Sequence, residues 1–160
     1  NPSMLVSLFG PRVQTTEKGL ALLDNPQWFW SQKARGRFLG YAKAQRERLE
    51  GVRGGKHTNR PELVAKYGYD TKYAMHMLRL CFQGIEYMHT GRIALPMDDE
   101  RGDFLRSVRH GEVSKDEAIG TSLSLEHQLR CMVSAAPPEP DYAAIDRWLL
   151  DLSGHRSYSS

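Results

Sequence analysis

The chain has 160 residues, of which 40% are hydrophobic and 26% charged, and its formal net charge is +3. These values are typical of one soluble globular domain, and so mild a positive charge does not by itself indicate a nucleic-acid-binding protein. No apolar run approaches the length of a membrane-spanning helix and no signal-peptide pattern is present, so we expect a cytoplasmic protein. The opening NPSMLVSLFGP lacks an initiator methionine, as expected of a processed chain, of an expression boundary or of the rear portion of a longer protein.

The first part of the chain predicts two short helices. One is expected over Met4–Phe9 and is ended by Gly10-Pro11, and the next begins at Thr15 or Thr16 and is ended by Asn25-Pro26. Three adjacent aromatic residues follow at 28–30. We interpret them as a packing anchor between helices, with a base-stacking platform as the alternative.

A longer and strongly basic helix is predicted over residues 31–50, with Ser31 as its N-cap. Its apolar side is expected to consist of Ala34, Phe38, Tyr41, Ala42 and Gln45. Gly36 and Gly40 lie four residues apart and predict a groove where another backbone approaches closely. The next segment, GVRGGKHTNRP, is patterned as a flexible basic loop.

The stretch GYDTKYAMHMLRL begins a helix that is apolar around most of its circumference, with Asp70 as the expected N-cap and Thr90-Gly91 as its end. Lys72, His76 and Arg79 are spaced by four and three residues, so they share one stripe of this helix. The stripe is interpreted either as the one wet face of a core helix or as the wall of an anion site.

The remaining segments also predict helices. Residues 92–96 form a short strand or an extended connector, and the acidic run DDERGD starts the next helix. Ser114 and Glu117 match a capping box and open a helix through about Val133. Prolines at 137, 138 and 140 form a stiff linker before a last helix capped by Asp141. We therefore expect an all-α bundle of about six to seven helices in one domain, 1–150, with a frayed tail over 151–160.

Metal and nucleophile chemistry find little support in the residue pattern. The six histidines form no H-x-x-x-H pair, and Cys81 and Cys131 are expected to be buried thiols without a disulfide. Asp98-Asp99-Glu100 with Asp103 would suit magnesium in principle, but carboxylates at a helix start are more often a cap favoured by the helix dipole. A Walker loop and a G-x-S-x-G elbow are absent.

The remaining feature is a set of cationic side chains that we expect on one side of the molecule. Lys72 lies in the first turn of its helix, where exposed backbone N–H groups and a lysine together favour a phosphate. His76 and Arg79 extend the stripe, and Lys56, His57 and Arg60 lie just upstream on the basic loop. These groups are expected to converge near one helix end.

Several of these runs resemble the C-terminal helical region of the predicted nucleotidyltransferase family of the DNA polymerase beta superfamily, common in bacteria and phages. The resemblance covers residues 1 to about 150. The runs that carry it are Lys56-His57, Tyr69–Leu80, Gly84–Glu86, Thr90-Gly91, Leu95-Pro96 and Gly111-Glu112, with NPSMLVSLF and the segment from Ala34 to Gln45.

The resemblance implies a helical half that closes over an NTP while a sheet domain, absent from this sequence, supplies G-S and D-x-D motifs with two Mg²⁺ ions. The full protein would transfer a nucleoside monophosphate to an acceptor. Lys72, His76, Arg79, Lys56 and His57 would then contact phosphates, and this chain would contribute no catalytic or metal-binding residue. Two alternatives stay open: a stand-alone helical module that binds nucleic acid or protein without catalysis, and a purely structural bundle.

Overall fold

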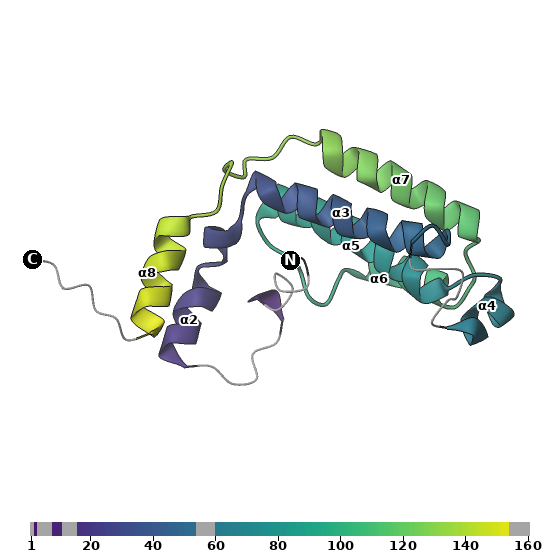
Figure 1. The fold of residues 1–160 in the computed structure, drawn as a ribbon, viewed down its shortest axis with the longest axis horizontal. Helices are drawn as coiled ribbons and strands as arrows, with labels where there is room; N and C mark the ends of the chain where they lie inside the picture. The colour runs from purple at the N-terminus through teal and green to yellow at the C-terminus, as the bar shows by residue number, and fades with distance from the viewer. Residues whose placement is uncertain (1, 3–7, 11–15, 54–59, 154–160) are drawn as a thin grey trace, which may run out of the picture.

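The computed structural model describes residues 2, 8–10, 16–53 and 60–153. These contain seven α-helices and one 3₁₀-helix, and no β-strand, so the predicted all-α class is confirmed for the described part of the chain. The elements, drawn in Figure 1, are α2 (Glu17–Asp24), η1 (Pro26–Phe29), α3 (Gln32–Leu49), α4 (Pro61–Tyr67), α5 (Thr71–Thr90), α6 (Asp99–Arg109), α7 (Lys115–Cys131) and α8 (Tyr142–Leu152).

Helix α5 is the centre of the bundle, because α3, α6 and α7 all pack against it. It is buried along most of its length, including Met77 and Leu78, both fully inaccessible. Helix α3 buries one side against it, with Phe38 at 0% exposure and 6.0 Å between the Phe38 and Tyr87 ring centroids. The predicted burial of this basic helix through Phe38 is confirmed, whereas Tyr41, expected on its apolar side, is 40% exposed.

Close helix contact occurs at a different glycine from those expected. A Cβ built on Gly36 or Gly40 meets no heavy atom within 4 Å, so the predicted close backbone approach at these positions is wrong. A Cβ on Gly84 of α5 would instead lie 2.8 Å from Leu129 Cδ2 and 2.9 Å from Phe38 Cβ. The absence of a side chain at Gly84 therefore lets α3 and α7 both pack onto the same turn of α5.

A buried polar network joins the three central helices. Arg46 of α3 donates to both carboxylate oxygens of Glu126 in α7, each at 3.3 Å, and Ser122 donates to Glu126 Oε1 at 3.1 Å. The Ser122 hydroxyl also lies 3.8 Å from Cys81 Sγ, and burial raises the pKa of that thiol to about 12. The network satisfies a carboxylate that would be costly to bury unpaired.

At one end of the bundle, α2 lies beside α8, and η1 links this pair to α3 (Figure 1). Trp30 packs against the core and its Nε1 donates to Tyr87 O at 3.0 Å, which confirms the packing-anchor interpretation for this residue of the aromatic run. Gly91 ends α5 at φ 71° and lies against the Trp30 ring.

Smaller expectations are corrected by the structure. Residues 92–96 form a connector, which is one of the two expected alternatives, whereas α7 ends at Cys131, two residues before its expected end. Cys131 is exposed, so only one of the two thiols is buried. Helix α8 reaches Leu152, past the expected start of the tail. The helix predicted over Met4–Phe9 lies largely outside the described residues. No helix in the described part of the chain is long and apolar enough to span a membrane.

Candidate functional site

The first turn of α5 is capped from within the chain. The Asp70 carboxylate accepts from the backbone N–H groups of Lys72 at 3.0 Å and Tyr73 at 3.2 Å. Arg60 donates to the same carboxylate at 2.8 Å, and its guanidinium lies 4.7 Å from the Tyr73 ring centroid. The expectation that exposed amides at this end help to bind a phosphate is therefore wrong for these two groups. The backbone N–H groups of Lys72 and Tyr73 are therefore not available to an anion.

The structure supports the predicted grouping of Lys72, His76 and Arg79, which we call the cationic stripe. Lys72 and Arg79 are exposed and His76 is half-buried. Arg79 Nη2 lies 2.8 Å from His76 Nδ1. Because arginine only donates, His76 Nδ1 must accept, which assigns the neutral imidazole its proton on Nε2. The stripe therefore offers an ammonium, a guanidinium and an imidazole N–H as donors.

The electrostatics of His76 show that a third cation lies near the stripe, beside Lys72 and Arg79. Its pKa is lowered from 6.5 to about 4, first by burial and then by the positive charges of Arg79, Arg48 and Lys72. Arg48 comes from the last turns of α3, so the packing of α3 on α5 brings its charge to the stripe. Arg48 is absent from the predicted site residues, although its place in the basic helix was apparent.

The cations of this cluster lack acidic partners within the described structure. None of Arg48, Lys72 and Arg79 forms an ion pair within 4 Å with a carboxylate of residues 16–53 or 60–153. Elsewhere the same helix supplies a partner: Glu86 Oε1 accepts from Ala94 N at 3.2 Å and lies 3.9 Å from Arg101. Beyond Arg79, the polar stripe of α5 therefore makes contacts within the fold through Glu86. At Lys72 and Arg79 it has no carboxylate partner among the described residues.

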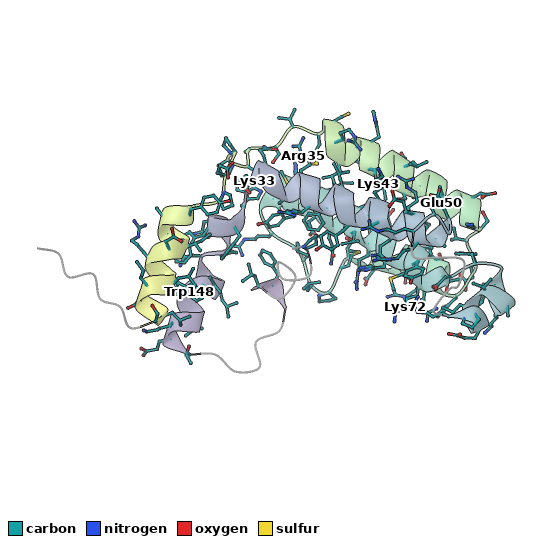
Figure 2. All side chains as sticks on the ribbon, viewed as in Figure 1. Lys33, Arg35, Lys43, Glu50, Lys72 and Trp148 are labelled. Atoms are coloured by element: carbon teal, nitrogen blue, oxygen red, sulfur yellow. The ribbon has the colours of Figure 1, made fainter. Side chains whose placement is uncertain are left out.

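Figure 2 shows where Lys72, the first residue of the cationic stripe, lies. Lys72 lies on the lower side of the bundle and Lys43 on the upper side. Lys43 sits on α3, is well exposed and lies 3.8 Å from Glu47 one turn away. The two lysines therefore carry the same charge on opposite sides of the bundle. Lys56 and His57, the other predicted phosphate contacts, lie outside the described residues.

The acidic residues at the start of α6 do not form a metal site. Asp98 caps α6 by accepting from Arg101 N at 3.0 Å, and its carboxylate also pairs with the Arg101 guanidinium. Asp103 pairs with Arg106. Among the described residues no group of three or more His, Cys, Asp or Glu is placed to hold a metal ion. These carboxylates serve as a helix cap and as partners for arginines, and they do not fit a magnesium centre.

A second cationic feature lies on the exposed side of α3, and none of its residues is among the predicted site residues. It is a groove of about 360 Å³ lined by Gly36, Arg37, Gly40, Tyr41, Ala44, Gln45, Arg48 and Arg53, which we call the arginine groove. Arg48 belongs to the groove and also acts on His76, so the groove and the stripe adjoin. The spacing of Arg37, Tyr41 and Arg48 along one helical face is the signal that would have found it.

A family model described as the RNA repair pathway DNA polymerase beta family matches residues 1–151. No curated protein and no solved structure matches the chain. The match spans nearly the whole sequence and confirms the resemblance carried by Lys56-His57 and Tyr69–Leu80. The chain belongs to the RNA repair pathway DNA polymerase beta family.

Proposed function

We propose that this chain is the nucleotide-binding helical part of a nucleotidyltransferase, with the cationic stripe and Arg48 holding the triphosphate of an NTP. One observation carries the proposal: cations from α3 and α5 gather around a neutral His76, with no carboxylate of the described residues paired to them. Like charges brought together raise the free energy of the fold unless an anion offsets them. A triphosphate is such an anion, and the family match supports a nucleotide as its source.

Each group has a distinct role in this proposal. Lys72 supplies a mobile point charge, and Arg79 supplies a planar fork that suits two phosphate oxygens. His76 donates from Nε2, and Arg48 adds a cation on the side of the site that α3 forms. In the full enzyme, Mg²⁺ bound with the NTP would neutralise phosphate charge and activate the acceptor hydroxyl, and its ligands would come from a catalytic part with G-S and D-x-D motifs. Lys56 and His57 are proposed to contact phosphates as well.

The test is binding of ATP and of inorganic tripolyphosphate to the whole chain, measured by calorimetry in wild type, Lys72→Ala, Arg79→Ala and Lys43→Ala. Loss of a charge-assisted hydrogen bond costs about 1.5 to 3 kcal/mol, so we expect roughly ten- to hundredfold weaker binding for the first two variants. Lys43→Ala removes the same charge as Lys72→Ala from the opposite side of the bundle. It should leave affinity nearly unchanged. Equal affinities in all four proteins would refute the proposal.

Turnover distinguishes the helical part from a complete enzyme. We expect no transfer from NTP to any acceptor with Mg²⁺ and this chain alone, because the described carboxylates cap or pair with arginines. Transfer that persists through purification and is lost in an Asp98→Asn/Asp99→Asn double variant would place a catalytic centre at α6 instead. Binding of polynucleotide without any binding of ATP would favour the alternative of a module without catalysis.

A further inference from the structure

The arginine groove has features that binding of a single nucleotide does not require. Arg37 and Arg48, both exposed, lie at its two ends on α3, and neither pairs with a carboxylate of the described residues. Arg53, the third arginine, lies 3.6 Å from Glu47, which is outside the groove. No acidic side chain lines the groove. Its ligand is therefore expected to be anionic.

The length of the groove indicates a polymer. Arg37 and Arg48 are separated by eleven residues of one α-helix, which at 1.5 Å per residue is about 16 Å along the axis. A single triphosphate is too short to reach both guanidinium groups when they extend from the helix in parallel. A nucleic-acid strand with about 3.4 Å between stacked nucleotides covers the same distance in roughly five steps. The two arginines fit phosphates several nucleotides apart.

The middle of the groove offers a surface for a base. Tyr41 lies between the two arginines in sequence, lines the groove and is 40% exposed, although the fold buries its neighbours Phe38 and Ala42 completely. Gly36 and Gly40 lie beside it with open space where a Cβ would stand. An exposed aromatic ring between cations is the combination that single-strand-binding proteins use for stacking and phosphate contact.

We propose that the arginine groove binds single-stranded nucleic acid, with phosphates on Arg37 and Arg48 and a base against Tyr41. The proposal does not depend on the proposed function, because Arg37, Tyr41 and the two glycines lie outside the cationic stripe. Arg48 is the one residue that both features share. The occupant is a nucleic-acid strand and not an acidic peptide because Tyr41 supplies a stacking surface that a chain of carboxylates does not use.

The test is fluorescence anisotropy of the whole chain with a labelled 12-nucleotide single strand of mixed sequence, over a series of salt concentrations. Tyr41→Ala should weaken binding roughly tenfold through lost stacking. Arg37→Gln should weaken it by a similar factor and reduce the slope of log K against log salt by about 0.7, the value for one phosphate contact on a single strand. Lys43→Gln, on the same helix but outside the groove lining, is the charge control and should change neither quantity by as much.

Gly40→Gln separates folding from binding. Space above Gly40 is open and glutamine is the better helix former, so the variant should melt at or above the wild-type temperature. Its side chain would fill the groove floor, and oligonucleotide binding should fall at least severalfold. Lys72→Ala should leave oligonucleotide affinity within about twofold, because Lys72 is not part of the groove.

Two outcomes would overturn the proposal. One is equal oligonucleotide affinity in wild type, Tyr41→Ala and Gly40→Gln. The other is that a glutamate oligomer of equal charge binds as tightly as the oligonucleotide and that Tyr41→Ala weakens the binding of neither. That result would mark the groove as a surface for acidic protein segments. Loss of ATP binding in Lys72→Ala with unchanged oligonucleotide binding supports both sites. If the wild-type chain binds the oligonucleotide but not ATP, the proposed function fails and the groove proposal stands.

Discussion

The pKa of His76 offers a direct measure of the electrostatics around the cationic stripe. Burial and the charges of Arg79, Arg48 and Lys72 lower it from 6.5 to about 4. Between these two pH values the imidazole is therefore mostly neutral in the folded chain and mostly protonated in the unfolded chain. Because the unfolded state binds more protons between pH 4 and pH 6.5, the stability contributed by neutral His76 is full above pH 6.5. It is lost as the pH falls toward 4. At 1.36 kcal/mol per pKa unit the whole loss is about 3 kcal/mol.

The assay is urea denaturation at a series of pH values from 4 to 7, with wild type compared to His76→Gln. Glutamine keeps an oxygen that can accept from Arg79 but does not titrate. The difference in unfolding free energy between the two proteins should therefore be constant above pH 6.5 and should shift by about 3 kcal/mol in favour of the variant by pH 4. Parallel stability curves throughout this range, or an imidazole that titrates near 6.5 by NMR, would refute the electrostatic description.

The same titration also tests the proposed ligand. A polyphosphate bound beside His76 favours the charged imidazolium, so saturating tripolyphosphate should raise the pKa of His76 in the NMR titration. A rise of one unit corresponds to tenfold tighter binding of the ligand to the protonated form. Lys72→Ala should weaken the binding of tripolyphosphate and so reduce the rise in the pKa of His76 at a fixed tripolyphosphate concentration. A pKa that stays near 4 while binding is saturated would place the ligand elsewhere.

The remaining predictions are measured by denaturation and by nucleotide affinity. Phe38→Ala should cost about 3 to 5 kcal/mol through an unfilled cavity, and an unchanged melting temperature would mean that α3 is peripheral. Gly84→Ala should cost about 1 to 3 kcal/mol, because the new Cβ would lie 2.8 Å from a side chain of α7; a neutral effect would contradict the close packing. Lys72→Ala should change stability by less than about 0.5 kcal/mol and weaken nucleotide binding, whereas Met77→Ala should cost about 2 to 5 kcal/mol. Arg48→Gln should raise the pKa of His76 and weaken both nucleotide and oligonucleotide binding, and an unchanged pKa would show that Arg48 does not act on the stripe.

The helix boundaries were predictable where a short sequence signal determines them. Asp70 accepts from two N–H groups at the start of α5, and Gly91 takes the left-handed conformation at its end, as the residue types predict. Asp141 and Ser114 cap their helices in the same way. These contacts join residues two or three apart, so they do not depend on how the helices pack.

The neighbours of each helix face were not predictable in the same way. Gly36, Gly40 and Gly84 are all helical glycines, yet only Gly84 has a side chain of another helix where its Cβ would lie. Tyr41 lies one position from buried Ala42 and is exposed. Which glycine is covered depends on the rotation of each helix about its axis, and that rotation is fixed by packing between residues far apart in sequence. The proximity of Arg48 to His76 depends on the same packing.

The two sides of α3 show how the bundle distributes its charge. On the side toward α7, Arg46 pairs with Glu126 and Arg35 donates to Arg130 O at 3.1 Å, so the fold uses both arginines. On the groove side, Arg37 and Arg48 come from the same helix and have no carboxylate partner among the described residues. Helix propensity does not explain this difference, since arginine is an equally good helix former at all four positions. Surface charge alone does not explain it either, because Arg48 stands beside other cations that it repels. The two proposals, binding of an anion along the groove and along the stripe, would account for both the missing partners and the retained repulsion.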